Sequence, residues 1–343
     1  MADRELTRRA SPAAAPSPSD GRRIPVRRIP QPPPQRIRST WQLARPNRIR
    51  RALDVALSRN PGGWFVVGAS HDVPPATSVV RIVDGREVVL WRRDDRTLVA
   101  GPGACPHMGA LLSGCPVEGS VLFCRWHGMG LPAEGSDLWT PWPALDDGAL
   151  LWVRLPADGE SPTDRPAIPA RPPLAESIVG VISESGRCEP RDIVANRLDP
   201  WHGAWYHPYA FSHLSVDDDA SSDENLVVDV AFRLSRGFGI PVRAVFSCPD
   251  ARTVVMAIVA GEGAGSIVET HATPLGLDRD GRPRTMMVEA TIAHSPRAGF
   301  RLAKRVSPLV RQAMRHTARR LWVDDLAYAE RRFELRARGE SPD

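Results

Sequence analysis

Long apolar runs, cysteines and lysines are all scarce in this chain. No stretch of about 18 consecutive apolar residues occurs, so we expect no stable membrane span. The arginines near the start are not followed by an apolar stretch, which disfavours a cleaved secretory signal. The 5 cysteines in 343 residues are too few for a disulfide scaffold and suit a reducing compartment, so a cytoplasmic location is expected.

Positive charge is concentrated at the N-terminus. Residues 1–51 carry 13 arginines against Asp3, Glu5 and Asp20, whereas the whole chain has a net charge of only +5. Residues 11–34 are rich in Pro, Ala and Ser and lack the apolar content that would offset the entropy of ordering. We therefore expect residues 1–40 to form a disordered, solvated Arg/Pro-rich tail. The charge leaves a role at an anionic membrane open, but no aromatic residues alternate with the arginines, and we expect no nucleic-acid partner.

Two patterns of apolar residues divide the remainder of the chain. Short apolar runs separated by Gly, Pro and Asp are typical of small antiparallel strands, and they occur at 64–67, 79–83, 88–91, 120–123 and 149–155. We assign residues 41–160 to a first, all-β domain. A proline-rich connector at 156–175 spans its boundary with the second domain.

The second half, residues 161–343, predicts a different domain. Strand patterns occur at 226–234, 240–247, 252–260, 266–273 and 284–294, with a short helix at 196–207 and a long helix at 300–335. Strands followed by a long helix indicate an α+β fold.

Two cysteines and two histidines form the first metal-ligand pattern. Cys105 and His107 are separated by one residue, and Cys124 and His127 by two. Such a set can hold tetrahedral zinc or a [2Fe–2S] cluster with two thiolates on one iron and two imidazoles on the other. The cluster is favoured because both pairs are very short, lie between predicted strands and are surrounded by glycines that permit close backbone approach.

These residues resemble the Rieske family. The resemblance extends through residues 105–114 and 123–128 and covers most of 60–155. Respiratory Rieske proteins carry an extra disulfide-forming cysteine in each loop, and here Ala110 and Gly130 occupy those positions. The resemblance is therefore to the oxygenase and ferredoxin branch, for which fewer donors to the cluster imply a lower potential.

A second pattern lies about 80 residues further on, in Asp199, His202 and His207. Asp199 and His202 share one face of a helix, and Pro208 disfavours helical geometry at His207, so the chain can turn there. Behind a Rieske motif, this stretch resembles the mononuclear iron motif of Rieske non-haem iron oxygenases. Two imidazoles and one carboxylate on one side of iron leave positions open for dioxygen.

The resemblance implies the remaining assignments. The third iron ligand would come from an acidic pair on a late helix, with Asp325 favoured and Asp324 as the alternative. Asp199 would be a catalytic bridge between His202 and His127 of the partner subunit in a head-to-tail homotrimer. The second domain would have a helix-grip, START-like fold.

The implied function is that of a terminal oxygenase component. It would carry a [2Fe–2S] cluster and Fe(II), use O2, and hydroxylate or oxidatively demethylate a small apolar substrate of the isoprenoid, steroid or aromatic kind. Electrons would come from a separate ferredoxin or flavin reductase, because the chain has no Gly-rich nucleotide fingerprint.

Two alternatives remain at this point. One is a Rieske electron-transfer protein with a non-catalytic second domain, and the other is a zinc-stabilised binding module. Metal content separates all three, because the zinc module would be free of iron and the electron-transfer protein would lack the mononuclear iron.

Overall fold

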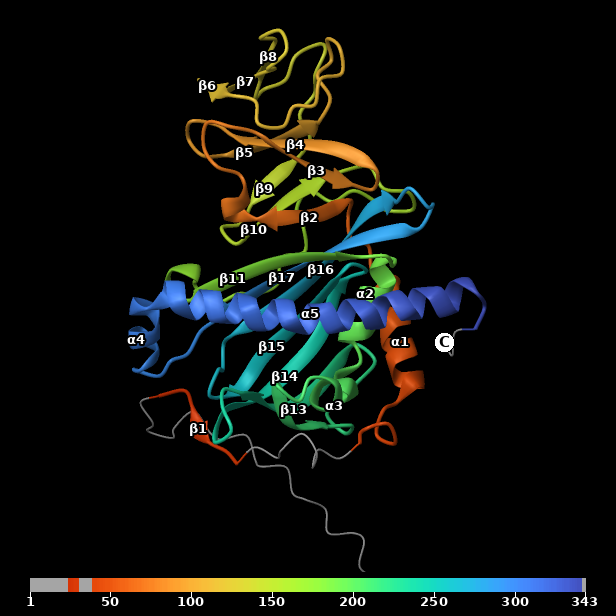
Figure 1. Cartoon of the computed structure of the whole chain (residues 1–343), viewed down its shortest axis with the longest axis vertical. Helices are drawn as coiled ribbons and strands as arrows, with labels where there is room; N and C mark the ends of the chain where they lie inside the picture. The colour runs from red at the N-terminus through yellow and green to blue at the C-terminus, as the bar shows by residue number, and fades with distance from the viewer. Residues whose placement is uncertain (1–23, 31–38, 341–343) are drawn as a thin grey trace, which may run out of the picture.

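Antiparallel strands dominate both halves of the computed structural model, which describes residues 24–30 and 39–340 (Figure 1). The strands of the first half are stacked above a large sheet formed by the second half, and one long helix crosses that sheet. This arrangement confirms the α+β prediction. No described helix combines the length and apolar character needed to cross a bilayer.

The first half contains three small sheets, with strand orders β2-β10-β9, β3-β4-β5 and β6-β7-β8. Their strands are β2 (Trp64–Ala69), β3 (Val79–Val83), β4 (Arg86–Arg92), β5 (Leu98–Pro102), β6 (Val117–Glu118), β7 (Val121–Phe123), β8 (Gly130–Pro132), β9 (Ala144–Asp146) and β10 (Leu150–Arg154). The β3–β4 hairpin shows how sequence sets this geometry: Asp84 and Gly85 have φ of 49° and 72°, as a two-residue turn of that type requires. Trp91 and Trp152 are fully buried in this half.

The second half forms one eight-stranded sheet in the order β11-β17-β16-β15-β14-β13-β12, with β1 added beside β14. Its strands are β1 (Arg27–Arg28), β11 (Ile178–Gly186), β12 (Phe211–Val216), β13 (Asn225–Arg233), β14 (Phe238–Asp250), β15 (Thr253–Gly261), β16 (Ile267–Leu277) and β17 (Pro283–Ala293). Strands β13 to β17 confirm the five predicted strands, while β11 and β12 were not predicted.

The C-terminal helix is divided where one continuous helix was predicted. Helix α4 (Phe300–Arg305) and helix α5 (Ser307–Ala337) are separated by Val306, and α5 begins beside Pro308. Proline is tolerated in the first turn of a helix but disfavours helical geometry in the residue before it, which explains the break. Helix α5 then buries Trp322, Leu326 and Ala329 against the sheet and α2.

Two segments near the N-terminus pack against the second half. Helix α1 (Pro46–Leu57), which the prediction placed in the first domain, buries Leu53 and its neighbours among residues of β13 to β15. Residues 24–30, predicted to be part of a disordered tail, are held by β1 beside β14 and by an ion pair of 2.6 Å from Arg27 Nε to the fully buried Glu262. The other predicted tail residues, 1–23 and 31–38, lie outside the described part, whereas residues 39 and 40 lie within it.

A buried charge cluster joins the two halves. Arg171, in the proline-rich connector, donates to Glu269 on β16 at 2.5 and 2.6 Å and lies 2.9 Å from Asp147 in the β9–β10 turn. Burial raises the pKa of the Asp147 and Glu269 carboxyls, but hydrogen bonds and charge, led by the Arg171 guanidinium, outweigh that effect and lower both. The guanidinium thus compensates two carboxylates at once, one from each half.

Replacing Arg171 by Met should lower the free energy of unfolding by roughly 3–5 kcal/mol, because two buried carboxylates lose their counterion. Urea denaturation followed by far-UV circular dichroism measures the change. The matched control is Arg187→Met, whose side chain is about half exposed and pairs with Asp278, and which should cost less than about 1 kcal/mol. Equal losses in the two variants would contradict the special role of Arg171.

Candidate metal centres

Two similar loops bring the first predicted ligand set together. One loop lies between β5 and β6 and the other between β7 and β8. In each loop a glycine N–H donates to the cysteine carbonyl at 2.8 Å, from Gly109 to Cys105 and from Gly128 to Cys124. Both glycines have φ near +70°, a conformation that other residues rarely adopt.

The four side chains differ in exposure in a way that suits a cluster. Cys105 and Cys124 are buried, whereas His107 and His127 are exposed and their ring centroids lie 4.8 Å apart. Two buried thiolates and two outward imidazoles match the asymmetric ligand set of a Rieske [2Fe–2S] centre. The imidazoles are therefore the part of this centre that a redox partner can reach.

The second predicted ligand set also meets at one point. Ligand atoms of His202, His207 and Asp325 all lie within 4.8 Å of one another. The residues come from three elements: η4 (Pro200–His202), the end of α3 (Gly203–Tyr206) and the middle of α5.

The local chain geometry differs from the predicted single helix at 196–207. Helix α2 (Pro190–Arg197) ends before Asp199, and a short 3-10 turn and α3 follow. Pro200 and Pro208 explain the interruptions, because the residue before a proline is pushed away from helical geometry. The turn at His207 places its ring centroid 5.3 Å from that of His202, although five residues separate them.

Asp325 provides the common contact. Its Oδ1 atom lies 2.8 Å from His207 Nε2 and 3.3 Å from His202 Nε2, and it accepts a hydrogen bond of 3.2 Å from Asn196 Nδ2. Burial raises the pKa of Asp325, but the two imidazoles outweigh burial and hold it well below its usual range. For His202, burial lowers the pKa of the imidazole, but the carboxylates of Asp199 and Asp325 outweigh burial and raise this pKa to about 9.

This donor set fits a divalent iron. Two neutral imidazoles and one carboxylate on the same side are the ligand type of non-haem Fe(II) sites, and a cation would compensate the carboxylate charge that raises the pKa of His202. The second predicted acid, Asp324, lies outside this group. Its Oδ2 atom accepts a hydrogen bond of 2.7 Å from the Tyr209 hydroxyl and is 3.6 Å from His207 Nδ1, on the far side of that ring.

Tyrosines surround the second centre, and sequence reasoning assigned no role to Tyr209 and Tyr328. The chain has only 3 tyrosines, and all of them contact the cluster. The Tyr328 ring stacks on His202 with centroids 5.6 Å apart, and the Tyr209 hydroxyl is 3.3 Å from His207 Nδ1. The signal available in the sequence was their position, because two flank His207 and the third lies one turn after Asp324.

Asp199 lies beside His202, and the two oxygens of its carboxylate differ in their contacts. Its Oδ2 atom is 3.6 Å from His202 Nδ1 and accepts a hydrogen bond of 3.4 Å from Tyr328. Within the described residues, the buried Oδ1 atom of Asp199 and Nδ1 of His202 have no hydrogen-bond partner. A buried carboxylate oxygen of this kind can accept one more donor.

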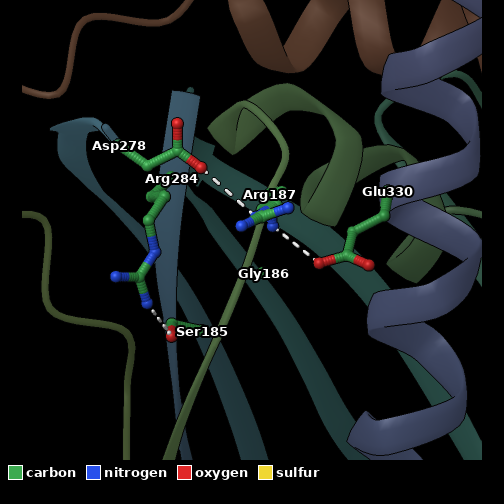
Figure 2. Close-up of a pocket in the computed structure, with 6 residues that line it drawn as sticks. All are labelled: Ser185, Gly186, Arg187, Asp278, Arg284 and Glu330. Carbon is green, nitrogen blue, oxygen red and sulfur yellow. Dashed lines mark hydrogen bonds and ion pairs between the residues drawn. The ribbon is translucent and has the colours of Figure 1, made fainter. Parts of the chain in front are cut away.

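Two other features lie apart from both centres. His213 is exposed on β12, where Nδ1 lies 3.1 Å from the Ser212 hydroxyl. A surface pocket between the ends of β11 and β16 and helix α5 is lined by Ser185, Gly186, Arg187, Asp278, Arg284 and Glu330 (Figure 2). Figure 2 shows that Arg187 contacts Asp278 and Glu330 and that Arg284 contacts Ser185. The pocket contributes no residue to either ligand set.

Family comparisons cover both halves of the chain. The model described as a domain of unknown function, DUF5914, matches residues 157–340, and the Rieske [2Fe-2S] domain model matches residues 63–146.

Curated relatives match shorter parts. A putative toluene-4-sulfonate monooxygenase iron-sulfur subunit of Comamonas testosteroni is 29% identical over 173 residues, which are 46% of this chain and 48% of the relative. The cholesterol 7-desaturase of Xenopus laevis is 32% identical over 102 residues, 29% of this chain and 22% of that protein. The chain thus spans about half or less of these curated relatives.

Solved structures resemble the chain over most of its length. Dicamba monooxygenase bound to dicamba has a TM-score of 0.58 at 18% identity and covers 82% of this chain and 89% of its own. The terminal oxygenase of carbazole 1,9a-dioxygenase from Nocardioides aromaticivorans has a TM-score of 0.52 at 14% identity, covering 86% and 90%. At these identities the likeness establishes a shared fold.

Substituting the two adjacent acids separately should distinguish their roles. Asp325→Asn should abolish binding of one Fe(II) or Co(II) per chain, whereas Asp324→Asn should weaken it by about tenfold, because only the hydrogen bonding behind His207 is disturbed. Metal titration of apo protein, followed by Co(II) absorbance, measures both affinities.

Glu334→Gln, on the exposed face of the same helix, is the matched control and should leave the affinity unchanged. Stronger loss for Asp324→Asn than for Asp325→Asn would contradict the ligand assignment.

Proposed function

We propose that this chain, which belongs to the DUF5914 family and also contains a Rieske [2Fe–2S] domain, is the terminal oxygenase component of a Rieske oxygenase system. The observation that carries the proposal is the meeting of His202, His207 and Asp325 in a chain that also brings the four Rieske ligands together. The catalytic unit would comprise residues 161–343 together with α1, and the Rieske unit the remainder of 41–160.

The two centres would have different chemical roles. When bound, the [2Fe–2S] cluster supplies single electrons, and the iron supplies activation of O2 for insertion into an apolar substrate. His202, His207 and Asp325 would hold the iron from one side and leave the other side accessible. Asn196 restrains the Asp325 carboxylate, and Tyr209 and Asp324 orient the His207 ring from behind.

Electrons would pass between subunits of a head-to-tail homotrimer. Figure 1 shows the β6–β8 loops at the far end of the molecule from α3, so the two centres of one chain lie far apart. His127 is exposed at that tip, and Asp199 Oδ1 is a buried acceptor without a partner among the described residues. We infer that Asp199 accepts an N–H from His127 of the partner subunit and so connects the two centres.

An apolar substrate is supported by the side chains facing the second centre. The Phe211 ring lies 6.3 Å from His207 and 5.6 Å from Phe232, and Leu214 packs against the same apolar cluster of the sheet. The names of the similar proteins refer to a sterol and to aromatic compounds, which is consistent with hydroxylation or oxidative demethylation of a steroid, isoprenoid or aromatic substrate. A separate ferredoxin or flavin reductase would supply the electrons.

Metal content and a single substitution test this function. The purified chain should contain three irons, two in the cluster and one at the second centre. His202→Ala should remove one iron and all product formation while the visible cluster spectrum persists. Product is measured as a mass gain of one or two oxygens after dithionite-reduced protein is mixed with apolar compounds under O2.

His213→Ala, an exposed histidine on β12, is the control and should retain the third iron. Product formation by His202→Ala would reject the second-centre assignment. Two irons in the unaltered chain would favour an electron-transfer protein, and a colourless zinc protein would favour a binding module.

A further inference from the structure

Apolar and basic side chains share one exposed face at the end of the large sheet. The face is formed by residues 24–30, the β13–β14 turn, α4 and the first turn of α5. Its exposed apolar side chains are Ile24, Leu234, Phe238, Leu302, Val306 and Leu309. Its exposed basic side chains are Arg28, Arg236, Arg301 and Arg305. We call this the basic apolar face.

One buried carboxylate holds these segments together. Glu262 has a fully buried side chain that lies 2.6 Å from Arg27 Nε and 3.3 Å from Arg297 Nε. Arg27 belongs to β1, which pairs with β14 next to the β13–β14 turn, and Arg297 lies three residues before α4. The basic N-terminal segment and the basic approach to α5 are therefore anchored at the same sheet end.

The charge on these segments has one sign. Residues 24–30, 234–238 and 297–309 contain six arginines and Lys304 but no acidic residue. The carboxylate that anchors the face, Glu262, is buried and already compensated. An occupant of the face must therefore be anionic, and it must also accept aliphatic side chains.

Two aliphatic side chains of the basic apolar face are mostly exposed to solvent. Leu302 and Leu309 are 64% and 74% exposed, one on α4 and one on the first turn of α5. Contiguous exposed apolar residues rimmed by Arg and Lys are the pattern of helices that lie in the headgroup region of a membrane. Aliphatic residues enter the acyl boundary while the guanidinium groups contact lipid phosphates.

We propose that the basic apolar face docks this protein onto an anionic phospholipid surface without crossing it. An acidic protein could match the arginines, but we favour lipid because Leu302 and Leu309, both mostly exposed, lie among the basic groups. Docking of this kind goes beyond the proposed oxygenase function and does not depend on it.

Flotation of the full-length protein with vesicles tests the proposal. Binding is expected to vesicles that contain phosphatidylglycerol, not to pure phosphatidylcholine, and should fall as NaCl is raised from 0.1 to 0.5 M. The triple variant Arg28→Gln, Arg301→Gln, Arg305→Gln should bind on the order of a hundredfold more weakly, from about fivefold for each charge near the surface. Leu302→Ser with Leu309→Ser should also weaken binding, but without a change in salt dependence.

The matched control removes three arginines at the opposite end of the sheet: Arg279→Gln, Arg282→Gln, Arg284→Gln. It should bind like the unaltered protein, and an intact visible cluster spectrum shows that each variant has folded. No binding to anionic vesicles at low salt overturns the proposal, as does equal weakening in the two triple variants. Smaller oligomers for the leucine variant without vesicle binding would assign the face to contacts between copies. Loss of electron acceptance from an acidic ferredoxin without vesicle binding would assign it to a protein donor.

Discussion

The contact of one carboxylate with two imidazoles sets the requirements for the rest of the second half of the chain. Asp325 is buried on α5, so the long helix must lie flat against the sheet to bring that carboxylate to His202 and His207. The sheet supplies the support, because Trp322 and Leu326 on the same helix pack against it. The opposing segment must bend twice, which the prolines at 200 and 208 achieve. A buried carboxylate is tolerated here because both imidazoles and Asn196 contact it.

The two metal centres use the fold in opposite ways. The Rieske ligands lie on loop tips whose geometry depends on the positive φ of Gly109 and Gly128, and their imidazoles face outward. The second centre lies between a helix layer and a sheet, and its ligands come from segments more than 100 residues apart. An outward centre suits electron exchange with another molecule, and a buried centre suits chemistry that is shielded from water. Under the proposed function, Asp199, whose buried Oδ1 atom has no hydrogen-bond partner among the described residues, would connect the two centres.

Local sequence patterns predicted the parts of both sites that depend on neighbouring residues. The Cys–His pairs and the five central strands follow from spacing and alternation, whereas His202 and His207 were assigned through the family resemblance. The resemblance favoured Asp325 and kept Asp324 as the alternative. Spacing alone could not choose between them, because adjacent helical residues point about 100° apart and packing decides which faces inward. Tyr209 and Tyr328 were missed for a related reason, since their contacts join segments that no local pattern connects. The break before Pro308 was missed because apolar periodicity continues across it, although the proline itself was visible.

The N-terminal segment shows how a composition typical of disorder can include an ordered anchor. Residues 24–30 have few apolar neighbours in sequence, but they pair with β14 where β15 has already ended at Gly261. The ordering entropy of this short piece is offset by Glu262, whose fully buried carboxylate would be costly without the guanidinium groups of Arg27 and Arg297. The partners in the first of these ion pairs are 235 residues apart, so composition could not reveal it. The ion pairs of Glu262 with Arg27 and Arg297 order residues 24–30 and also bring them near α4. Basic residues that are far apart in the sequence therefore lie on one surface.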